Sequence, residues 1–253
     1  MELRFDSDGF ELVGHLARPE RRSVGRLPGL VICHGFPSGA AGPSSSVTGY
    51  LALADRIAQD LGWVVLAVNY RGCGGSEGNF SLRGWYDDTC AAVEWLAGQT
   101  DVGAVWIAGF GTGGALGICA GANDDRVRGV AAVAPPADFD DWCRNPRRLL
   151  LHSRRLDLIH SDDWPASFDD WAAELGTLKA VDSAPMLAPR PLLLIHGADD
   201  EAVPVFDSRV IADAHGNADL RVIGSAGHAL RYDPRAVAVL LGWLDRQRHR
   251  TPL

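Results

Sequence analysis

The chain has 253 residues and a formal net charge of −8, with 24 Lys and Arg against 32 Asp and Glu. This length suits one sizeable domain or two small ones, and it can bury a large core without disulfides or metals. An acidic chain lacks the concentrated basic face that binds phosphates, so nucleic acid is not expected as the main partner. One basic cluster, at 144–155, is interpreted as a solvated helix face with internal ion pairs.

The cysteines and the N-terminal residues indicate the cellular compartment in which the protein is expected. The cysteines are odd in number and form no C-x-x-C pair; they are Cys33, Cys73, Cys90, Cys119 and Cys143. Such usage predicts a cytoplasmic protein without a zinc site. We find neither a signal-peptide pattern nor an apolar window of about 18 residues, so no membrane partner is expected. The sequence carries no signature of a metal or organic cofactor, and it indicates no oligomeric state.

The first elements in the chain form a predicted hairpin. Alternating apolar and polar residues at 3–7 and 10–19 are separated by Asp8 and Gly9. Asp-Gly between two such runs is a strong hairpin signal. The pattern then changes to continuous apolar runs, which are typical of strands buried on both faces. These runs lie at 28–35, 63–70, 104–110, 127–136, 191–197 and 220–224.

Helical segments alternate with these buried strands. They are expected at about 48–61, 83–97, 112–121 and 234–247. The alternation predicts an α/β fold with a mostly parallel sheet, helices on both faces and an antiparallel N-terminal edge. It stops at 138–188, where tryptophans stand among charged residues, and here we expect a helical cap over the strand ends. The predicted core domain therefore comprises 1–137 and 189–253.

The stretch GFGTGG at 109–114 lies between a predicted strand and a predicted helix. It fits the dinucleotide fingerprint G-x-G-x-x-G. That motif normally opens the first βαβ unit, with an acidic residue at the tip of the next strand, and here the next strand ends in AVAPP. The stretch also fits the nucleophile elbow G-x-S-x-G, with Gly111 where serine is expected. The elbow is favoured, because its partner segments follow in the required order.

That order is an oxyanion loop, the nucleophile, an acid and then a histidine. The segment HGFP at 34–37 follows an early buried strand. The backbone N–H of Phe36 would point at a developing oxyanion, and the N–H of Thr112 would be the second donor. The segment HGADDEAVP at 196–204 would supply the acid, and SAGH at 225–228 the histidine.

In these motifs and their order, the chain resembles bacterial α/β-hydrolase-fold proteins of the small esterase, dienelactone-hydrolase or serine-peptidase-like type. Two more segments are similar to that family, NYRGCGGSEG at 69–78 and GWYDDTCAAVEWL at 84–96. The resemblance covers nearly the whole chain outside 138–188 and implies an α/β-hydrolase fold. It assigns the acid to Asp200 and the histidine to His228. Asp199 and Asp138 remain alternatives for the acid.

The chain departs from this family at the nucleophile. Gly111 has no side chain and cannot form an acyl-enzyme, and removing the nucleophile from a working triad costs on the order of 10⁶ in kcat. Four other sites are weaker candidates for the nucleophile, because each is expected to lie at a helix start, in a surface loop or in the core. They are Thr112, Ser38, the PSSS run at 43–46 and Cys33.

Three functions are compatible with this degenerate triad. The chain is a hydrolase of small esters or thioesters if His228, oriented by its acid, deprotonates a water that attacks the substrate directly. It is a non-catalytic binding or sensing protein if Gly111 only relieves backbone strain at the elbow. It is also compatible with an engineered, nucleophile-lacking form of a serine hydrolase. The retained acid and histidine favour the first and third interpretations, and the missing serine favours the second.

The cap is expected to cover the site. Five aromatic residues are candidates for lining an apolar acyl pocket, or for fixing the cap on its domain: Trp142, Trp164, Trp171, Phe139 and Phe168. An apolar pocket predicts a small acyl or aromatic ester as the ligand.

Overall fold

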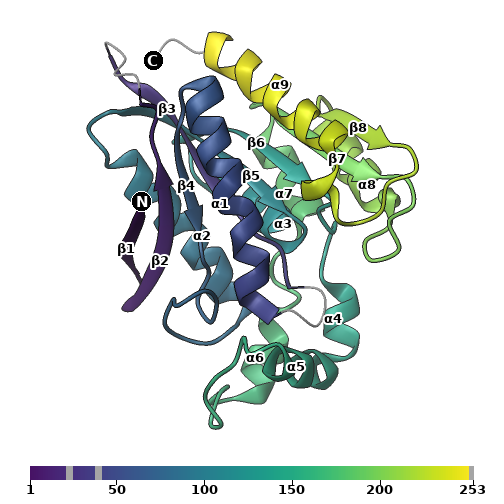
Figure 1. Cartoon of the computed structure of the whole chain (residues 1–253). Coiled ribbons are helices and arrows are strands. Elements are labelled where there is room, and N and C mark those ends of the chain that lie inside the picture. Colours follow the sequence, from purple (N-terminus) through teal and green to yellow (C-terminus); the bar gives the residue numbers. More distant parts are fainter. Residues whose placement is uncertain (21–24, 38–41, 251–253) are drawn as a thin grey trace.

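A computed structural model describes residues 1–20, 25–37 and 42–250 of the chain. Its centre is an eight-stranded sheet in the order β1-β2-β4-β3-β5-β6-β7-β8. The strands from β4 to β8 in this order are parallel, whereas β1 and β2 are antiparallel to their neighbours. Figure 1 shows the sheet between two layers of helices. The predicted α/β fold with an antiparallel N-terminal hairpin is confirmed.

The strands form where the sequence shows alternating or continuous apolar runs. The hairpin turns at Asp8 and Gly9, whose φ angles of 54° and 81° suit an Asp-Gly turn. The bounds are β1 (Glu2–Ser7), β2 (Phe10–Ala17), β3 (Leu27–Cys33), β4 (Val64–Val68), β5 (Val102–Phe110), β6 (Val127–Val133), β7 (Leu192–Gly197) and β8 (Asp219–Ile223). All residues of β4 and β7 are buried, as expected for strands covered on both faces.

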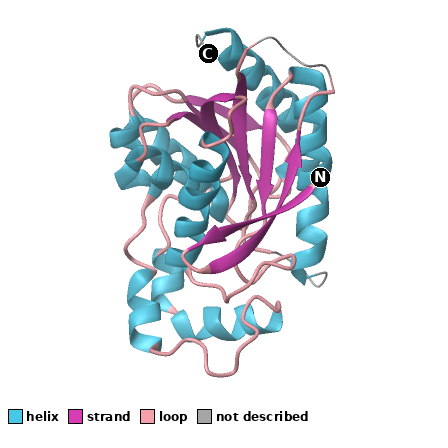
Figure 2. Cartoon of the chain, turned by 90° about the vertical axis from the view of Figure 1, so that its left-hand side faces the viewer, coloured by secondary structure: helices cyan, strands magenta, loops and turns pink. Residues whose placement is uncertain are grey.

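Helices cover both faces of the sheet (Figures 1 and 2). Residues of α1 and α9 pack on one face, and residues of α2, α3, α7 and α8 pack on the other. The bounds are α1 (Gly42–Leu61), α2 (Leu82–Ala97), α3 (Thr112–Asn123), α4 (Asp140–Arg144), α5 (Pro146–Arg155), α6 (Phe168–Glu174), α7 (Ala180–Leu187), α8 (Val205–His215), the short 3₁₀ helix η1 (Leu230–Tyr232) and α9 (Pro234–Arg250). Within the described ranges, none of these helices is both long and apolar enough to cross a membrane.

The segment expected to be a cap divides into two parts. Helices α4 to α6 lie beyond the end of the sheet, away from its two helical layers (Figure 1). Helix α7 instead packs against α3 and α8 and buries Ala180, Ala184 and Leu187. Its alanines allow a close approach to α3, which is itself made mostly of small residues. Helix α7 therefore packs with the helices that cover the sheet, whereas α4 to α6 lie apart from them.

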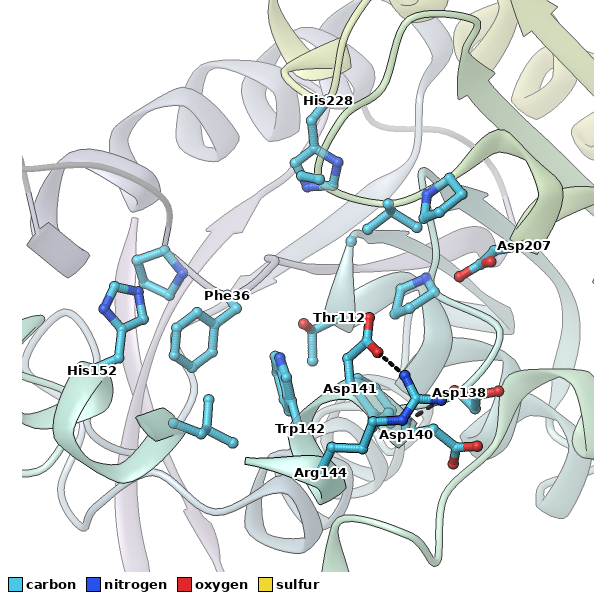
Figure 3. Close-up of a pocket in the computed structure, with 18 residues that line it drawn as sticks. Phe36, Thr112, Asp138, Asp140, Asp141, Trp142, Arg144, His152, Asp207 and His228 are labelled. Atoms are coloured by element: carbon cyan, nitrogen blue, oxygen red, sulfur yellow. Dashed lines mark hydrogen bonds and ion pairs between the residues drawn. The ribbon is translucent and has the colours of Figure 1, made fainter. Parts of the chain in front are cut away.

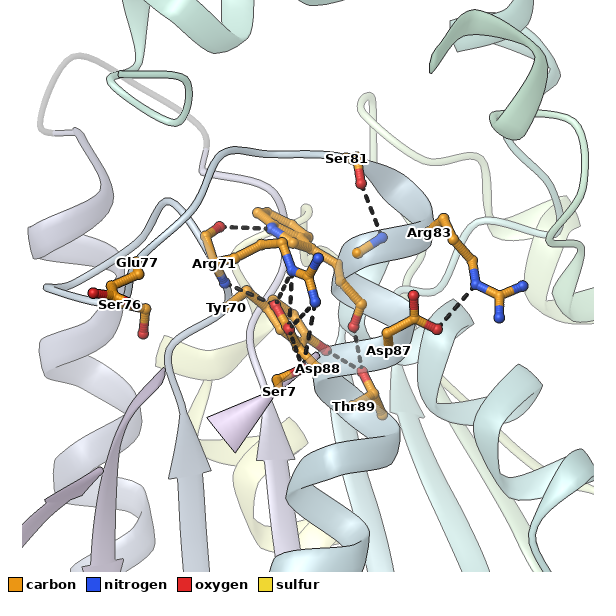
Figure 4. Close-up of polar contacts among 12 residues, drawn as sticks. Ser7, Tyr70, Arg71, Ser76, Glu77, Ser81, Arg83, Asp87, Asp88 and Thr89 are labelled. Carbon is orange, nitrogen blue, oxygen red and sulfur yellow. Dashed lines mark hydrogen bonds and ion pairs between the residues drawn. The ribbon is translucent and has the colours of Figure 1, made fainter. Parts of the chain in front are cut away.

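A buried ion pair fixes the turn that follows β4 (Figure 4). Arg71 Nη2 lies 2.7 Å from Oδ1 of Asp88 on α2, and the two side chains are 7% and 0% exposed. The backbone N–H of Arg71 and the hydroxyl of Ser7 also donate to this carboxylate, at 2.8 and 2.7 Å. Burial raises the pKa of Asp88, while the hydrogen bonds and charge of Arg71 oppose that rise. The pair ties β1, the turn and α2 together.

Replacing Asp88 by Asn should therefore destabilise the protein by about 3–5 kcal/mol, because Arg71 would keep a buried charge without its partner. Urea unfolding followed by circular dichroism measures this loss. The matched control is Asp87→Asn, which breaks the more exposed Arg83–Asp87 pair on the same helix and should cost no more than about 1 kcal/mol. Equal losses in the two variants would contradict the role given to the buried pair.

Candidate active site

The chain turns sharply at Gly111, between the end of β5 and the start of α3. Gly111 has φ 51° and ψ −123°, a conformation that side-chain-bearing residues adopt only at a cost. Its N–H donates to the carbonyl of Val133, and its own carbonyl accepts from Gly114 and Ala115 in the first turn of α3. A strand that passes into a helix through one strained residue has the geometry of a nucleophile elbow.

The glycines on both sides of Gly111 are required by close backbone contacts. A Cβ on Gly109 would lie 2.2 Å from the carbonyl oxygen of Gly113, and a Cβ on Gly113 would lie 2.3 Å from that of His34. A Cβ on Gly111 itself would meet nothing nearer than His228 Nε2, at 3.6 Å. The backbone therefore has room for a serine at position 111 but not for side chains at the other two.

His228 lies opposite Gly111 and is oriented by Asp200. Its Nδ1 is 2.8 Å from Oδ2 of Asp200, whose side chain is fully buried. Oδ1 of Asp200 accepts the backbone N–H groups of Ala202 and Val203, both at 2.9 Å. A carboxylate held in this way fixes the tautomer with hydrogen on Nδ1, so that Nε2 faces the site as a base.

The other two acids considered from the sequence do not contact His228. Asp199 is exposed, and its backbone N–H donates to Ala226. Asp138 accepts the N–H of Asp140 at 2.9 Å and lies in the wall of the cavity described below. The geometry thus pairs His228 with Asp200.

A second histidine supports the loop that carries Asp200. His196 is buried; its Nε2 lies 2.9 Å from the carbonyl of Val203 and its Nδ1 lies 2.6 Å from the hydroxyl of Ser208. Burial lowers the pKa of His196, which favours a neutral ring that donates from Nε2 and accepts at Nδ1. The ring connects the end of β7 to the start of α8 and so positions Asp200.

The loop after β3 is held by His34. This ring is 2% exposed, and burial lowers its pKa to about 4. Neutral His34 donates from Nδ1 to the carbonyl of Gly35 and accepts the N–H of Tyr70 at Nε2. The backbone N–H groups of Phe36 and Thr112 donate to no acceptor among the described residues, and both residues line the cavity. They are available as oxyanion donors.

A cavity of about 560 Å³ opens beside Gly111 and His228. Figure 3 shows Phe36 and His152 on one side of it, and Asp207 on the side away from them. Phe36 packs edge-on against Trp142, with ring centroids 5.2 Å apart. Both aromatic residues line the cavity.

The cap tryptophans have different positions. Trp142 lines the cavity, as do Phe139 and Leu149. Trp164 and Trp171 do not line it; both donate from Nε1 to the carbonyl of Phe80, at 3.2 and 3.3 Å. These two residues attach α6 and the segment before it to the loop before α2. Of the replacement nucleophiles, Ser38 and the side chains of 43–46 lie outside the described residues, and Cys33 is buried in β3.

An acidic wall of the cavity was not expected from the sequence. Asp207, on the first turn of α8, accepts the N–H of Ala137 at 3.1 Å, and burial and the nearby charge of Asp138 raise its pKa. Asp140 and Asp141 also line the cavity, but they pair with Lys179 and Arg144. No motif marks Asp207, because its position depends on the direction in which α8 leaves β7.

The basic cluster at 144–155 contains fewer internal ion pairs than expected. Among the described residues, its one bond to a carboxylate joins Arg144 to Asp141. Arg154 instead binds the backbone carbonyls of Asp162 and Trp164. Arg147 lies over the ring of Phe168 at 5.5 Å. The arginines therefore join α5 to residues 162–164 and to α6, as well as facing solvent.

Comparison with known families gives a direct match. A family model described as the alpha/beta hydrolase fold matches residues 28–162. An uncharacterised protein of Mycobacterium tuberculosis is 31% identical over 205 residues, which cover 76% of this chain and 69% of that protein. The match to the family model includes the elbow at 109–114.

Solved structures are similar over almost the full chain. The esterase Est1E from Butyrivibrio proteoclasticus has a TM-score of 0.76 at 20% identity, covering 98% of this chain and 99% of its own. A proline iminopeptidase from Mycobacterium smegmatis has a TM-score of 0.69 at 18% identity, covering 98% and 99%. At these identities the likeness concerns the fold.

The space at position 111 yields a prediction. Gly111→Ser should place a hydroxyl beside His228 and make the protein react covalently with a fluorophosphonate probe, while the strained φ lowers stability by about 1–3 kcal/mol. Gel fluorescence and thermal unfolding measure the two effects. The double variant Gly111→Ser with His228→Ala should label weakly or not at all. Robust labelling of the unsubstituted protein would show that another residue is the nucleophile.

Proposed function

The chain belongs to the α/β-hydrolase family, and we propose that it hydrolyses small ester or thioester substrates without an acyl-enzyme, by direct attack of water. Gly111 closes the usual two-step route, because no side chain is present there to accept an acyl group. His228 and Asp200 remain arranged as a general base and its orienting carboxylate. Water then replaces the serine hydroxyl as the group that loses its proton to His228.

The proposed reaction has two steps. His228 Nε2 removes a proton from water as the water oxygen bonds to the substrate carbonyl carbon, and the carbonyl oxygen becomes an oxyanion held by the N–H groups of Phe36 and Thr112. The tetrahedral intermediate then collapses, and the bond to the leaving oxygen or sulfur breaks. His228 returns its proton to that leaving group, and the free acid departs.

The observation that carries this proposal is the fully hydrogen-bonded Asp200 beneath His228. Three donors serve its two oxygens, namely His228 and the N–H groups of Ala202 and Val203. Burying a carboxylate is costly unless it is bonded in this way. A protein that only binds a ligand has no need to orient a histidine toward the position of a missing nucleophile.

The cavity and the structural neighbours support an acyl substrate. A volume of about 560 Å³ accommodates a small acyl or aromatic group against Phe36 and Trp142. One neighbour, Est1E, has been solved with ferulic acid bound, at 21% identity and a TM-score of 0.77. An aromatic acyl group of that kind would meet aromatic side chains in the cavity of this chain.

The proposal predicts measurable but slow hydrolysis of activated esters that depends on His228. His228→Ala should lower kcat about 10²- to 10⁴-fold, because the general base is lost. The rate of p-nitrophenol release from p-nitrophenyl acetate measures this change in purified protein.

A matched control is His160→Ala, which removes an exposed histidine outside the cavity and should leave the rate unchanged. An absence of hydrolysis above the uncatalysed rate, or an unchanged rate in His228→Ala, would contradict the proposal. Either result would favour a non-catalytic binding role for the cavity.

A further inference from the structure

A second, much smaller cavity lies directly beside Gly111. Its volume is about 30 Å³, and it is lined by Gly35, Phe36, Tyr50, Phe110, Gly111, Val133, His228 and Arg231. A site of about 10–15 Å³ already holds one water when polar groups are present to bind it. Phe36, Gly111 and His228 also line the large cavity, so the two spaces meet where a serine side chain would stand.

Arg231 lines this small cavity, and one of its hydrogen-bond donors is unused. Its Nε is buried and has no partner among the described residues. A buried donor of this kind is costly to leave unbonded and points to a bound water or ligand. His228 supplies a complementary acceptor, because its Nδ1 is already bonded to Asp200 and its Nε2 has no partner among the described residues.

The fold holds Arg231 in place through its neighbours. Arg231 belongs to η1, three residues after His228, so one loop carries both groups. Its guanidinium lies 4.3 Å from the ring centroid of Tyr232 and 5.5 Å from that of Tyr50 on α1. Burial raises the pKa of Tyr50, with the charge of Arg231 acting against that rise, which keeps the phenol neutral beside the cavity.

From these contacts we propose that the small cavity is the binding site of the attacking water, and that Arg231 is its positioning residue. The water accepts a hydrogen bond from Arg231 Nε and donates one to His228 Nε2. Its second lone pair then faces the substrate carbonyl in the large cavity. The nearby guanidinium stabilises the negative charge that develops on the water oxygen as His228 takes the proton.

This inference rests on the proposed hydrolysis, but it gives the missing nucleophile a defined replacement. In a serine hydrolase the hydroxyl at this position would occupy part of the same space, since a Cβ on Gly111 lies 3.6 Å from His228 Nε2. Without that side chain there is space for a water molecule, and Arg231 and His228 supply its two polar contacts. The water is then bound in the space that the missing serine side chain leaves free.

A crystal structure at high resolution tests the water site without any need for turnover. We expect one ordered water within hydrogen-bond distance of both His228 Nε2 and Arg231 Nε. It should be absent from Arg231→Met, and Gly111→Ser should place Oγ in its position. Well-ordered density for both side chains with no water between them would overturn the inference, even if the protein hydrolyses esters.

Kinetics test the role of the same contact. Arg231→Met keeps an unbranched side chain but removes the donor, and we expect kcat to fall about 10- to 100-fold with KM within about twofold. The control Arg235→Met removes an exposed arginine that pairs with Asp233 and should change neither constant. An unchanged kcat in correctly folded Arg231→Met would overturn the positioning role.

Failure of the wild type to hydrolyse any ester would instead count against the proposed function. The crystal structure would still decide whether a water is held between Arg231 and His228.

Discussion

The backbone conformation at Gly111 is the constraint around which the site is built. Gly111, with φ 51° and ψ −123°, lies between the end of β5 and the start of α3. The sharp turn there brings backbone so close to Gly109 and Gly113 that neither position has space for a side chain. It also points position 111 at His228 and leaves the N–H of Thr112 at the start of a helix. Glycine adopts such angles with little strain. The chain thus keeps the geometry of an elbow at a lower conformational cost than a serine would incur.

The groups around the elbow fall into two electrostatic environments. On the inner side, neutral histidines at 34 and 196 support the loops that carry Phe36 and Asp200, because burial disfavours their charged forms. On the outer side, the cavity combines aromatic side chains with the carboxylates of Asp138 and Asp207. Neutral rings therefore fix the loops around the reacting centre, and the carboxylates of Asp138 and Asp207 lie in the wall of the large cavity.

Sequence reasoning recovered the parts of this molecule that depend on local pattern. Continuous apolar runs located β3 to β7, which are largely buried, and Asp8-Gly9 located the hairpin. The run at 220–224 was also expected to be buried, but β8 is an edge strand in which Ile223 alone is buried. Chain order placed Gly111, Asp200 and His228 in one site, and the structure brings them together. Helix α8 was not predicted, because its apolar pattern is weak and few of its residues are buried. Ile211 is one of those few. Arg231 and Asp207 were missed for a related reason: their places depend on how η1 and α8 pack, and no local motif encodes that. The separate roles of the three cap tryptophans likewise follow from tertiary contacts with Phe80.

Direct attack by water differs from acyl-enzyme chemistry in one observable respect, the mass of the protein during turnover. Intact-protein mass spectrometry on samples quenched while an activated thioester is being hydrolysed reports this mass. The proposed reaction predicts release of the free acid with the protein remaining at its unmodified mass at every time point. A transient increase equal to the acyl group would show that a side chain of this chain is acylated, and it would contradict the role given to Gly111, His228 and water.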